Sequence, residues 1–292
     1  MTGLDRRLFV GSTLAVASIA QTQSKLPPSV ADQLTRLRNS LGKGARLGVM
    51  AVDDRSGQEI AFDANSRFAM CSTFKLPLAA FVLRLADRGE LRLAERLPFE
   101  PGVPLENSPV VAANLKAGSL PIETLAAAAL RESDNSAANL LLRRTGGPVA
   151  LTRFVRACGD TVTRCDRYEL ALNSNVDGDP RDTTTPAAMA TLTQTLLLGG
   201  VLSLRSRTTL MKWMFTSVAK PNRLKAGFPR SWKVGHKPGT GREGAVNDVA
   251  VVQRPDGALI FVAAFISGGT AGGETRDAVQ RAIAGVVAAR LR

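Results

Sequence analysis

The sequence predicts an α/β fold of the α+β type, in which an antiparallel sheet is flanked by terminal helices and carries an inserted all-α lobe. Three regions support this prediction: a helix and two strands near the amino end, a predominantly helical middle, and two strands with a helix at the carboxyl end. Because an isolated hairpin is marginally stable in water, we expect the strands of both ends to join in one sheet.

The first elements follow from hydrophobic spacing near the amino end. Residues 29–39 predict a helix, since apolar side chains recur at helical spacing in Val30, Leu34 and Leu37. Residues 47–52 and 59–62 predict two strands that flank a turn-forming polar segment. This region therefore predicts a helix and a hairpin.

The rest of the chain continues this alternation. Between residues 72 and 206 the apolar positions follow a helical period. The β-rich runs at residues 249–252 and 259–266 flank a Pro-Asp-Gly turn, and residues 274–291 form an alanine-rich helical pattern. The end of the chain thus mirrors its beginning.

The amino terminus predicts an export signal at residues 1–20. Arg6 and Arg7 precede an apolar run that is too short to span a bilayer and that ends in small residues suited to cleavage. The arginine pair also fits a twin-arginine signal. We therefore expect a periplasmic or secreted protein without stable membrane insertion.

The length of 292 residues suits one large domain or two modest ones. We expect residues 21–68 and 210–292 to form a discontinuous α/β domain, and residues 69–209 to form a helical domain. No oligomerisation pattern stands out in the sequence, which favours a monomer.

Composition limits the chemistry. The net charge is +13, but aromatic residues make up only 5% of the chain, so we expect no specific nucleic-acid partner. Zinc hydrolases commonly bind their metal through several imidazoles, and a Ser-His-Asp triad needs a histidine beside the serine. Since His236 is the single histidine, we expect no metal, no cofactor and a base other than histidine.

Ser72 and Lys75 form the first catalytic candidate. They are three residues apart at the expected start of a helix, so their side chains share a face. Pro77 fits the first turn of that helix, and the helix N-terminus favours negative charge near the serine. The lysine amine is then placed to activate the hydroxyl.

Two further motifs strengthen this candidate, because the S-x-x-K pattern alone also occurs at residues 40–43 and 217–220. Ser133-Asp134-Asn135 follows in a polar break between helices, and Lys237-Pro238-Gly239-Thr240 precedes the last strands. In this order the motifs resemble those of class A β-lactamases and penicillin-binding proteins. The chain is similar to a class A serine β-lactamase over essentially its whole mature length. This resemblance implies a serine β-lactamase/DD-peptidase-like fold.

Glu169 favours the hydrolytic branch of that superfamily. Residues 167–173 resemble the loop that holds the hydrolytic water in class A enzymes, and penicillin-binding proteins generally lack this glutamate. A carboxylate with an amide four residues away, as in Glu169 and Asn173, can hold one water from two directions. In the family pattern Arg167 and Asp182 form the pair that bridges this loop.

The resemblance implies a proton-transfer network beside the nucleophile. Ser133 passes a proton to the lactam nitrogen, and Lys237 supports this transfer and the substrate carboxylate. Asn135 binds the amide of the substrate side chain, whereas Asp134 is structural. Whether Lys75 or Glu169, acting through water, deprotonates the nucleophile is left open by the sequence.

The resemblance also implies the binding groups around the reacting carbonyl. The backbone N–H groups of Ser72 and Thr240 form the oxyanion hole. Gly239 permits close approach of the strand to the ligand. Arg223 aligns with an arginine that some members project toward the carboxylate-binding region.

Pro238 departs from the Lys-Thr-Gly pattern of the family. The proline removes a hydroxyl that helps to bind the substrate carboxylate, and it removes a backbone N–H. Because an edge strand tolerates proline, we expect weakened binding and retained catalysis, with Thr240 substituting in part. We expect the neighbouring His236 to be a tuning or surface side chain.

The cysteines leave one alternative open. Cys71 precedes the nucleophile, as in carbapenem-hydrolysing members, but Gly241 stands where those members carry its disulfide partner. Cys71 is therefore expected to be a small buried apolar side chain. Cys158 and Cys165 either form a disulfide in an oxidising compartment or stay free, since their separation does not guarantee the required geometry.

The motifs also fit a second function. A penicillin-binding DD-peptidase, or a β-lactam sensor, shares the three motifs but releases the acyl group slowly. The pairing of Glu169 with Asn173 favours a β-lactamase that acts on penicillins and cephalosporins. Carbapenem hydrolysis depends on loop positions that the sequence does not determine.

Overall fold

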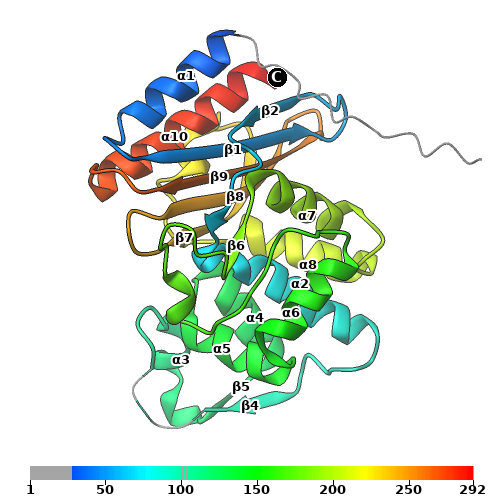
Figure 1. Ribbon diagram of the computed structural model, residues 1–292. Coiled ribbons are helices and arrows are strands. Elements are labelled where there is room, and N and C mark those ends of the chain that lie inside the picture. Colours follow the sequence, from blue (N-terminus) through cyan, green and yellow to red (C-terminus); the bar gives the residue numbers. More distant parts are fainter. Residues whose placement is uncertain (1–27, 100–101, 103, 292) are drawn as a thin grey trace, which may run out of the picture.

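The molecule combines an antiparallel sheet with a large helical region (Figure 1). The computed structural model describes residues 28–99, 102 and 104–291. The expected export signal at residues 1–20 lies outside these described residues. Within them, no helix has both the length and the apolar character needed to cross a membrane.

The sheet takes its strands from both ends of the chain, which confirms the predicted fold class. Its five strands run in the order β2, β1, β9, β8 and β7, with all neighbours antiparallel. The bounds are β1 (Arg46–Asp53), β2 (Glu59–Phe62), β7 (Lys233–Thr240), β8 (Val246–Gln253) and β9 (Leu259–Ser267). Strand β7, with the third motif, therefore lies at an edge of the sheet.

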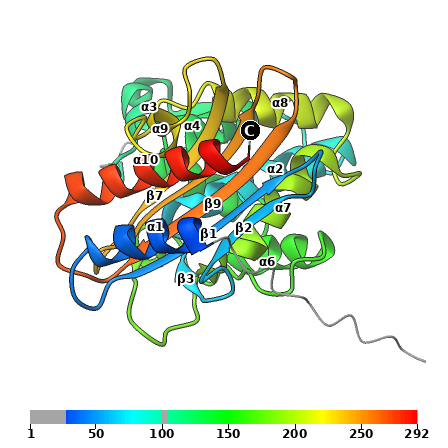
Figure 2. The same cartoon turned by 90° about the horizontal axis from the view of Figure 1, so that it is seen from above.

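Both faces of the sheet are covered by helices, so its strands are apolar on both sides. The terminal helices α1 (Pro28–Asn39) and α10 (Gly273–Arg290) cover one face (Figure 2). Val262 and Ala264 of β9 join the apolar cluster beneath those helices. Phe261 and Phe265 alternate with them and join the cluster on the helical-lobe side.

The remaining elements build the helical region and its connections. Helix α2 runs through its centre and buries most of its residues, including Leu76, Leu78 and Val82. The helices are α2 (Lys75–Asp87), α3 (Pro109–Ala113), α4 (Ile122–Arg131), α5 (Asn135–Arg144), α6 (Gly147–Ala157), α7 (Pro186–Leu198), α8 (Leu204–Phe215) and α9 (Leu224–Gly227). Three 3-10 turns are η1 (Cys71–Phe74), η2 (Leu115–Ala117) and η3 (Ala171–Asn173).

Two small sheets were not predicted. One pairs β3 (Phe68–Ala69) with β6 (Thr183–Thr184), and the other pairs β4 (Arg96–Pro98) with β5 (Ser119–Pro121). Strands this short show no sequence alternation from which a prediction could be made. The β3–β6 pair nevertheless matters, because it anchors the chain just before Ser72 to the chain just after Asp182.

Candidate active site

Ser72 lies at the junction of a tight turn and a helix. The helix was expected to begin at Ser72, but the structure places this residue in η1, and α2 begins only at Lys75. Cys71 has a φ of 48°, in the left-handed region that a right-handed helix excludes. The expected meeting of the two side chains still occurs, since Lys75 Nζ donates to Ser72 Oγ at 2.9 Å.

Glu169 completes a buried group around this pair. Its Oε1 lies 2.9 Å from Lys75 Nζ, and both side chains are fully buried. Ser72 Oγ donates to the same oxygen over 3.5 Å. On the other side, Asn173 Nδ2 donates to Glu169 Oε2 at 2.7 Å. The carboxylate therefore lies between the nucleophile, the lysine and the amide that the sequence pattern associated with it.

Asn139 positions Glu169 and was missed by the sequence analysis. Its Oδ1 accepts from the Glu169 N–H at 2.9 Å, and its Nδ2 donates to the Glu169 carbonyl at 2.9 Å. The side chain is buried on α5. An asparagine on the apolar side of a predicted helix was the available signal, because a buried amide needs hydrogen-bond partners.

The segment that carries Glu169, here called the Glu169 loop (residues 164–182), is closed by a charged pair. Arg167 Nε donates to Asp182 Oδ2 at 2.5 Å, and Asp182 is only 1% exposed. Asp182 Oδ1 also accepts from the backbone N–H groups of Asp166 and Arg167. The predicted bridging pair is thus confirmed, and it holds the two ends of the loop together.

A second lysine approaches from β7. Lys237 Nζ donates to Ser133 Oγ at 2.9 Å, and Lys75 Nζ donates to the Ser133 carbonyl at 3.0 Å. Ser133 has a φ of 62°, which turns its side chain and carbonyl toward the two lysines at the break between α4 and α5. The serine therefore connects the two ammonium groups.

Burial changes the acidity of both lysines. It lowers the pKa of Lys75, although the neighbouring Glu169 carboxylate acts in the opposite direction. Burial, followed by repulsion from Lys75, lowers the pKa of Lys237 well below the ordinary lysine range. Both amines consequently lose a proton more readily than a solvated lysine, which suits them to proton transfer.

The second motif also builds the local backbone. Asp134 caps α5 by accepting from the Ala137 N–H, and its other oxygen accepts from the N–H groups of Val110 and Val111. This confirms a structural role for Asp134. Asn135 Oδ1 accepts from Lys75 Nζ, and its Nδ2 donates to the Glu106 carbonyl at 2.6 Å.

The third motif is held against the nucleophile turn. A Cβ atom on Gly239 would lie 2.9 Å from the Met70 carbonyl oxygen and 3.2 Å from the Ser72 nitrogen. The close approach expected for this glycine is therefore present. Arg223 is buried behind the strand, where its Nη1 donates to the Gly239 carbonyl and its Nη2 donates to Thr240 Oγ1, at 2.8 and 2.7 Å.

The assembled groups surround a cavity of about 220 Å³. Its lining includes Ser72, Ser133, Asn135, Asn173 and Thr240. The other predicted site residues lie directly behind this lining, namely Lys75, Glu169, Lys237, Gly239 and Arg223. The structure thus brings together every residue that the motifs nominated.

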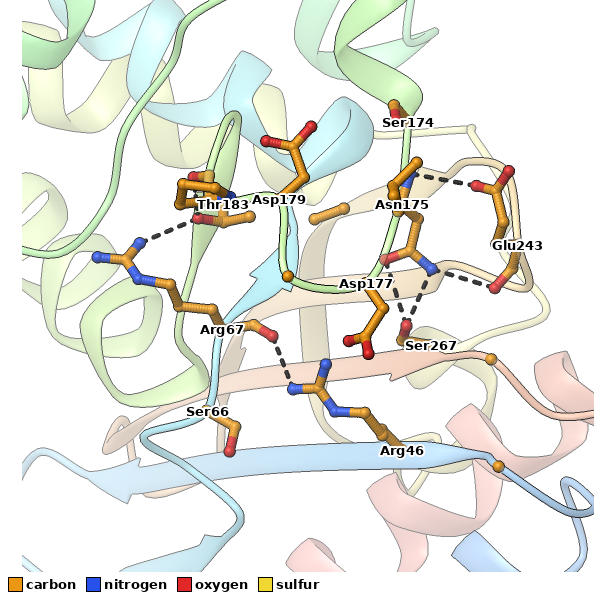
Figure 3. Close-up of a pocket in the computed structure, with 16 residues that line it drawn as sticks. Arg46, Ser66, Arg67, Ser174, Asn175, Asp177, Asp179, Thr183, Glu243 and Ser267 are labelled. Carbon is orange, nitrogen blue, oxygen red and sulfur yellow. Dashed lines mark hydrogen bonds between the residues drawn. The ribbon is translucent and has the colours of Figure 1, made fainter.

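A larger cavity, of about 670 Å³, lies behind the Glu169 loop (Figure 3). On its rim Asn175 Nδ2 donates to the Glu243 carbonyl at 3.0 Å and to Ser267 Oγ at 2.9 Å. The figure shows these three residues joined across the gap between the loop and the sheet. These hydrogen bonds connect this part of the loop to β9 and to the turn between β7 and β8.

The histidine corrects one expectation. His236 is fully buried, and its Nδ1 lies 2.9 Å from Asp248 Oδ2, so the expectation of a surface side chain is wrong. Alternation along β7 turns His236 away from Lys237 and onto the face that α9 and α10 cover. The neighbours of His236 in the chain do not indicate this burial, because it is caused by the helices that cover the sheet.

The cysteines are free, which settles the alternative for Cys158 and Cys165. Cys71 is completely buried, as expected, and burial raises the pKa of its thiol to about 12. A Cβ atom on Gly241 would come within 2.5 Å of Cys71 Sγ. The thiol therefore fills the space beside Gly241 as an inert packing group.

Comparison with known proteins supports the same assignment. The model of the β-lactamase enzyme family matches residues 29–290. The chain is 40% identical over 290 residues to β-lactamase L2 of Stenotrophomonas maltophilia, covering 97% of this chain and 95% of that protein. It is 35% identical over 280 residues to β-lactamase CTX-M-97 of Escherichia coli, covering 96% of this chain and 95% of that protein.

A solved structure extends the agreement to three dimensions. The class A β-lactamase described as the last common ancestor of Gram-negative bacteria superposes with a TM-score of 0.88 at 44% identity, covering 90% of this chain and all of that one. The family match, the relatives and the fold agree with the serine, lysine and glutamate geometry of the site. The chain belongs to the β-lactamase enzyme family, as a class A serine β-lactamase that hydrolyses β-lactams.

Proposed function

We propose that Ser72 attacks the lactam carbonyl carbon and that its hydroxyl proton reaches the lactam nitrogen through Lys75 and Ser133. The C–N bond breaks as the nitrogen takes up the proton, which leaves an ester on Ser72. The distances of 2.9 Å from Lys75 Nζ to Ser72 Oγ and 3.5 Å from Lys75 Nζ to Ser133 Oγ support this path. Glu169, acting through water, is the alternative first acceptor of the proton.

Backbone donors stabilise the negative charge that develops on the carbonyl oxygen in this proposal. The N–H groups of Ser72 and Thr240 form the oxyanion hole, and each donor contributes about 3 kcal/mol in comparable sites. Support comes from Gly239, whose missing side chain lets β7 approach the Ser72 nitrogen. The substrate carboxylate is bound by Lys237 and Thr240, whose hydroxyl is held by Arg223, itself paired with Asp277 at 2.7 Å.

Deacylation uses water activated by Glu169. The carboxylate takes a proton from the water as the oxygen attacks the acyl carbon. The ester bond to Ser72 breaks as Ser72 Oγ takes a proton from Lys75 Nζ, which lies 2.9 Å away. The position of Glu169 between Lys75, Ser72 and Asn173 is the observation that carries the proposal. Asn173 Oδ1 is buried and accepts no hydrogen bond within the described part of the chain, so its acceptor capacity is unused.

The deciding experiment follows benzylpenicillin and the protein together. Mature protein, from about residue 21, is incubated with excess benzylpenicillin. Loss of the lactam and the intact protein mass are then recorded. Many turnovers with mostly unmodified protein support the proposal. One equivalent consumed, with a lasting adduct on Ser72, instead supports the penicillin-binding DD-peptidase or sensor alternative.

Penicillins and cephalosporins are the proposed substrates, with antibiotic resistance as the consequence; carbapenem hydrolysis is the next activity to test.

Replacing Pro238 by threonine restores a hydroxyl near the carboxylate site, so we expect KM to fall about 3- to 10-fold while kcat changes little. Steady-state kinetics with benzylpenicillin and a cephalosporin check this expectation. An unchanged KM for every β-lactam tested would contradict it.

The acidity of Lys237 predicts a pH effect. Substrate binding requires the protonated amine, and the lowered pKa means that the proton is lost at a lower pH than for a solvated lysine. We therefore expect kcat/KM to fall early on the alkaline side. Lys237→Arg should move this fall to higher pH, since a guanidinium keeps its charge. The exposed Lys212→Arg serves as the control, and an unshifted profile for Lys237→Arg would refute the assignment.

The cellular setting is also a proposal. We infer that residues 1–20 direct export to the periplasm or the medium, because the arginine pair and the short apolar run have the form of a signal peptide. The mature chain is proposed to act as a monomer. Its domains are residues 21–68 with 210–292, and residues 69–209.

A further inference from the structure

A second ligand site is suggested by a cavity far along α2 from the nucleophile. The cavity has a volume of about 650 Å³ and lies between α2, α6 and the turn after α7. Helices α2 and α6 pack against each other there (Figure 1). Small-molecule sites commonly have volumes of about 300–1,000 Å³, so the cavity can hold one such ligand. It shares no lining residue with the catalytic cavity.

The wall of this cavity is aromatic and apolar. Phe81 of α2 and Phe154 of α6 stack with their ring centroids 4.9 Å apart and their planes at 21°. Leu85 and Val201 continue this surface and are only partly buried. Phe154 is only 8% exposed, so the open part of this wall is formed by Phe81, Leu85 and Val201. Such an apolar surface is suited to an apolar or aromatic ligand body.

The rim of the cavity is basic. Arg84, Arg88 and Arg153 line it, with Glu90 as the only acidic lining residue. Arg88 is paired with Glu90. Within the described residues, neither Arg84 nor Arg153 has a carboxylate oxygen within 4.0 Å. Arg84 Nη1 donates to the Val201 carbonyl at 2.8 Å, which holds this side chain at the mouth of the cavity. Two guanidinium groups beside this apolar surface therefore form no ion pair within that distance.

We propose that this cavity binds one small anionic amphiphile, an acyl or aromatic carboxylate or sulfonate. The apolar body lies on Phe81 and Phe154, and the anionic group lies between Arg84 and Arg153. Guanidinium groups bind carboxylates and similar oxyanions through paired hydrogen bonds, which accounts for the charge preference. The apolar body adds to the affinity, but the guanidinium groups are required, so an uncharged amphiphile of the same length binds much more weakly. This binding is independent of β-lactam hydrolysis.

The first test uses 1-anilinonaphthalene-8-sulfonate, whose fluorescence rises in apolar sites. We expect saturable binding at one site per chain, displaced by decanoate below its micelle concentration and not by decanol. Arg153→Glu should weaken binding at least about tenfold, because it removes one guanidinium and adds a repelling carboxylate. Arg36→Glu makes the same charge change on an exposed residue of α1 and should leave the binding unchanged.

A second test does not depend on the fluorophore. Cys158 also lines the cavity, whereas Cys71 and Cys165 are buried. Burial raises the pKa of the Cys158 thiol to about 11, so its reaction with an uncharged disulfide reagent is slow and measurable. Decanoate should slow that reaction several-fold. Cys158→Ser should remove the reaction, and Ala150→Trp, which places a bulky side chain in the cavity lining, should remove the slowing by decanoate.

Three results would overturn the proposal. The first is equal binding by Arg153→Glu and Arg36→Glu. The second is equal displacement by decanol and decanoate, because the site would then not select an anion. The third is a combined result: the protein binds anionic phospholipid vesicles, Arg153→Glu abolishes this binding, and decanoate does not displace the fluorophore. That last result would identify a membrane-facing surface in place of a site for a free ligand.

Discussion

Glu169→Gln is expected to stop the reaction after acylation. The glutamine keeps the size of the side chain and its contact with Asn173, but it cannot accept the proton of the attacking water. We expect kcat for benzylpenicillin to fall by about 10²–10⁴-fold, the usual contribution of a general base. Because Lys75 and Ser133 stay in place, the ester on Ser72 should still form and should accumulate.

Intact mass measured against time, together with rapid-mixing kinetics, checks this expectation. A burst of one lactam per chain followed by slow turnover, with the adduct mapped to Ser72, is the expected result. Asp177→Asn is a matched control, since it makes the same carboxylate-to-amide change at an exposed position of the same loop. Normal turnover by Glu169→Gln, or an equal loss in Asp177→Asn, would remove Glu169 from the proposed step.

Asp182→Asn is expected to weaken the contact that holds the two ends of the Glu169 loop together. Asp182 accepts from the Arg167 guanidinium and from two backbone N–H groups, and it is almost completely buried. Removing one partner of a buried charged pair commonly costs about 3–5 kcal/mol. Because Arg167 is partly exposed, we expect the free energy of unfolding to fall by about 3 kcal/mol, at the lower end of this range. Asparagine tolerates the left-handed φ of 57° at this position, so the change isolates the charge.

The same variant should deacylate slowly, because a loosened loop no longer holds Glu169 and Asn173 beside the ester. Denaturant unfolding and the lifetime of the acyl-enzyme measure the two effects. Asp177→Asn removes an exposed carboxylate of the same loop and should cause a much smaller loss of stability. A stable Asp182→Asn protein with normal deacylation would show that the loop does not depend on this pair.

Local sequence patterns correctly predicted the helices, strands and contacts whose residues lie close together in the chain. The helix predicted at residues 29–39 is α1, and the last predicted strands coincide with β8 and β9 to within a few residues. The contact between Ser72 and Lys75 also follows from a separation of three residues, and it survives the change from an expected helix start to a 3-10 turn. In these cases the backbone geometry of one turn or one strand sets the result.

Local patterns could not predict contacts between segments that lie far apart in the chain. Asn139 holds Glu169 across 30 residues of chain, and His236 is buried because helices cover both faces of the edge strand. The cavity between α2 and α6 is lined by residues of both helices and of the turn after α7, which lie far apart in the chain. A side chain's burial and partners depend on how whole elements pack.

The resemblance to class A β-lactamases identified the catalytic groups, because residue types and their order can be read from the sequence. The chemistry of serine, lysine and glutamate then limits the reactions that these groups can carry out together. The fold determines the distances between these catalytic groups. The sheet edge brings Lys237 to Ser133, and the charged pair of the Glu169 loop brings the carboxylate to within 3.5 Å of Ser72. Distances of that kind arise from long-range packing, which no local pattern encodes.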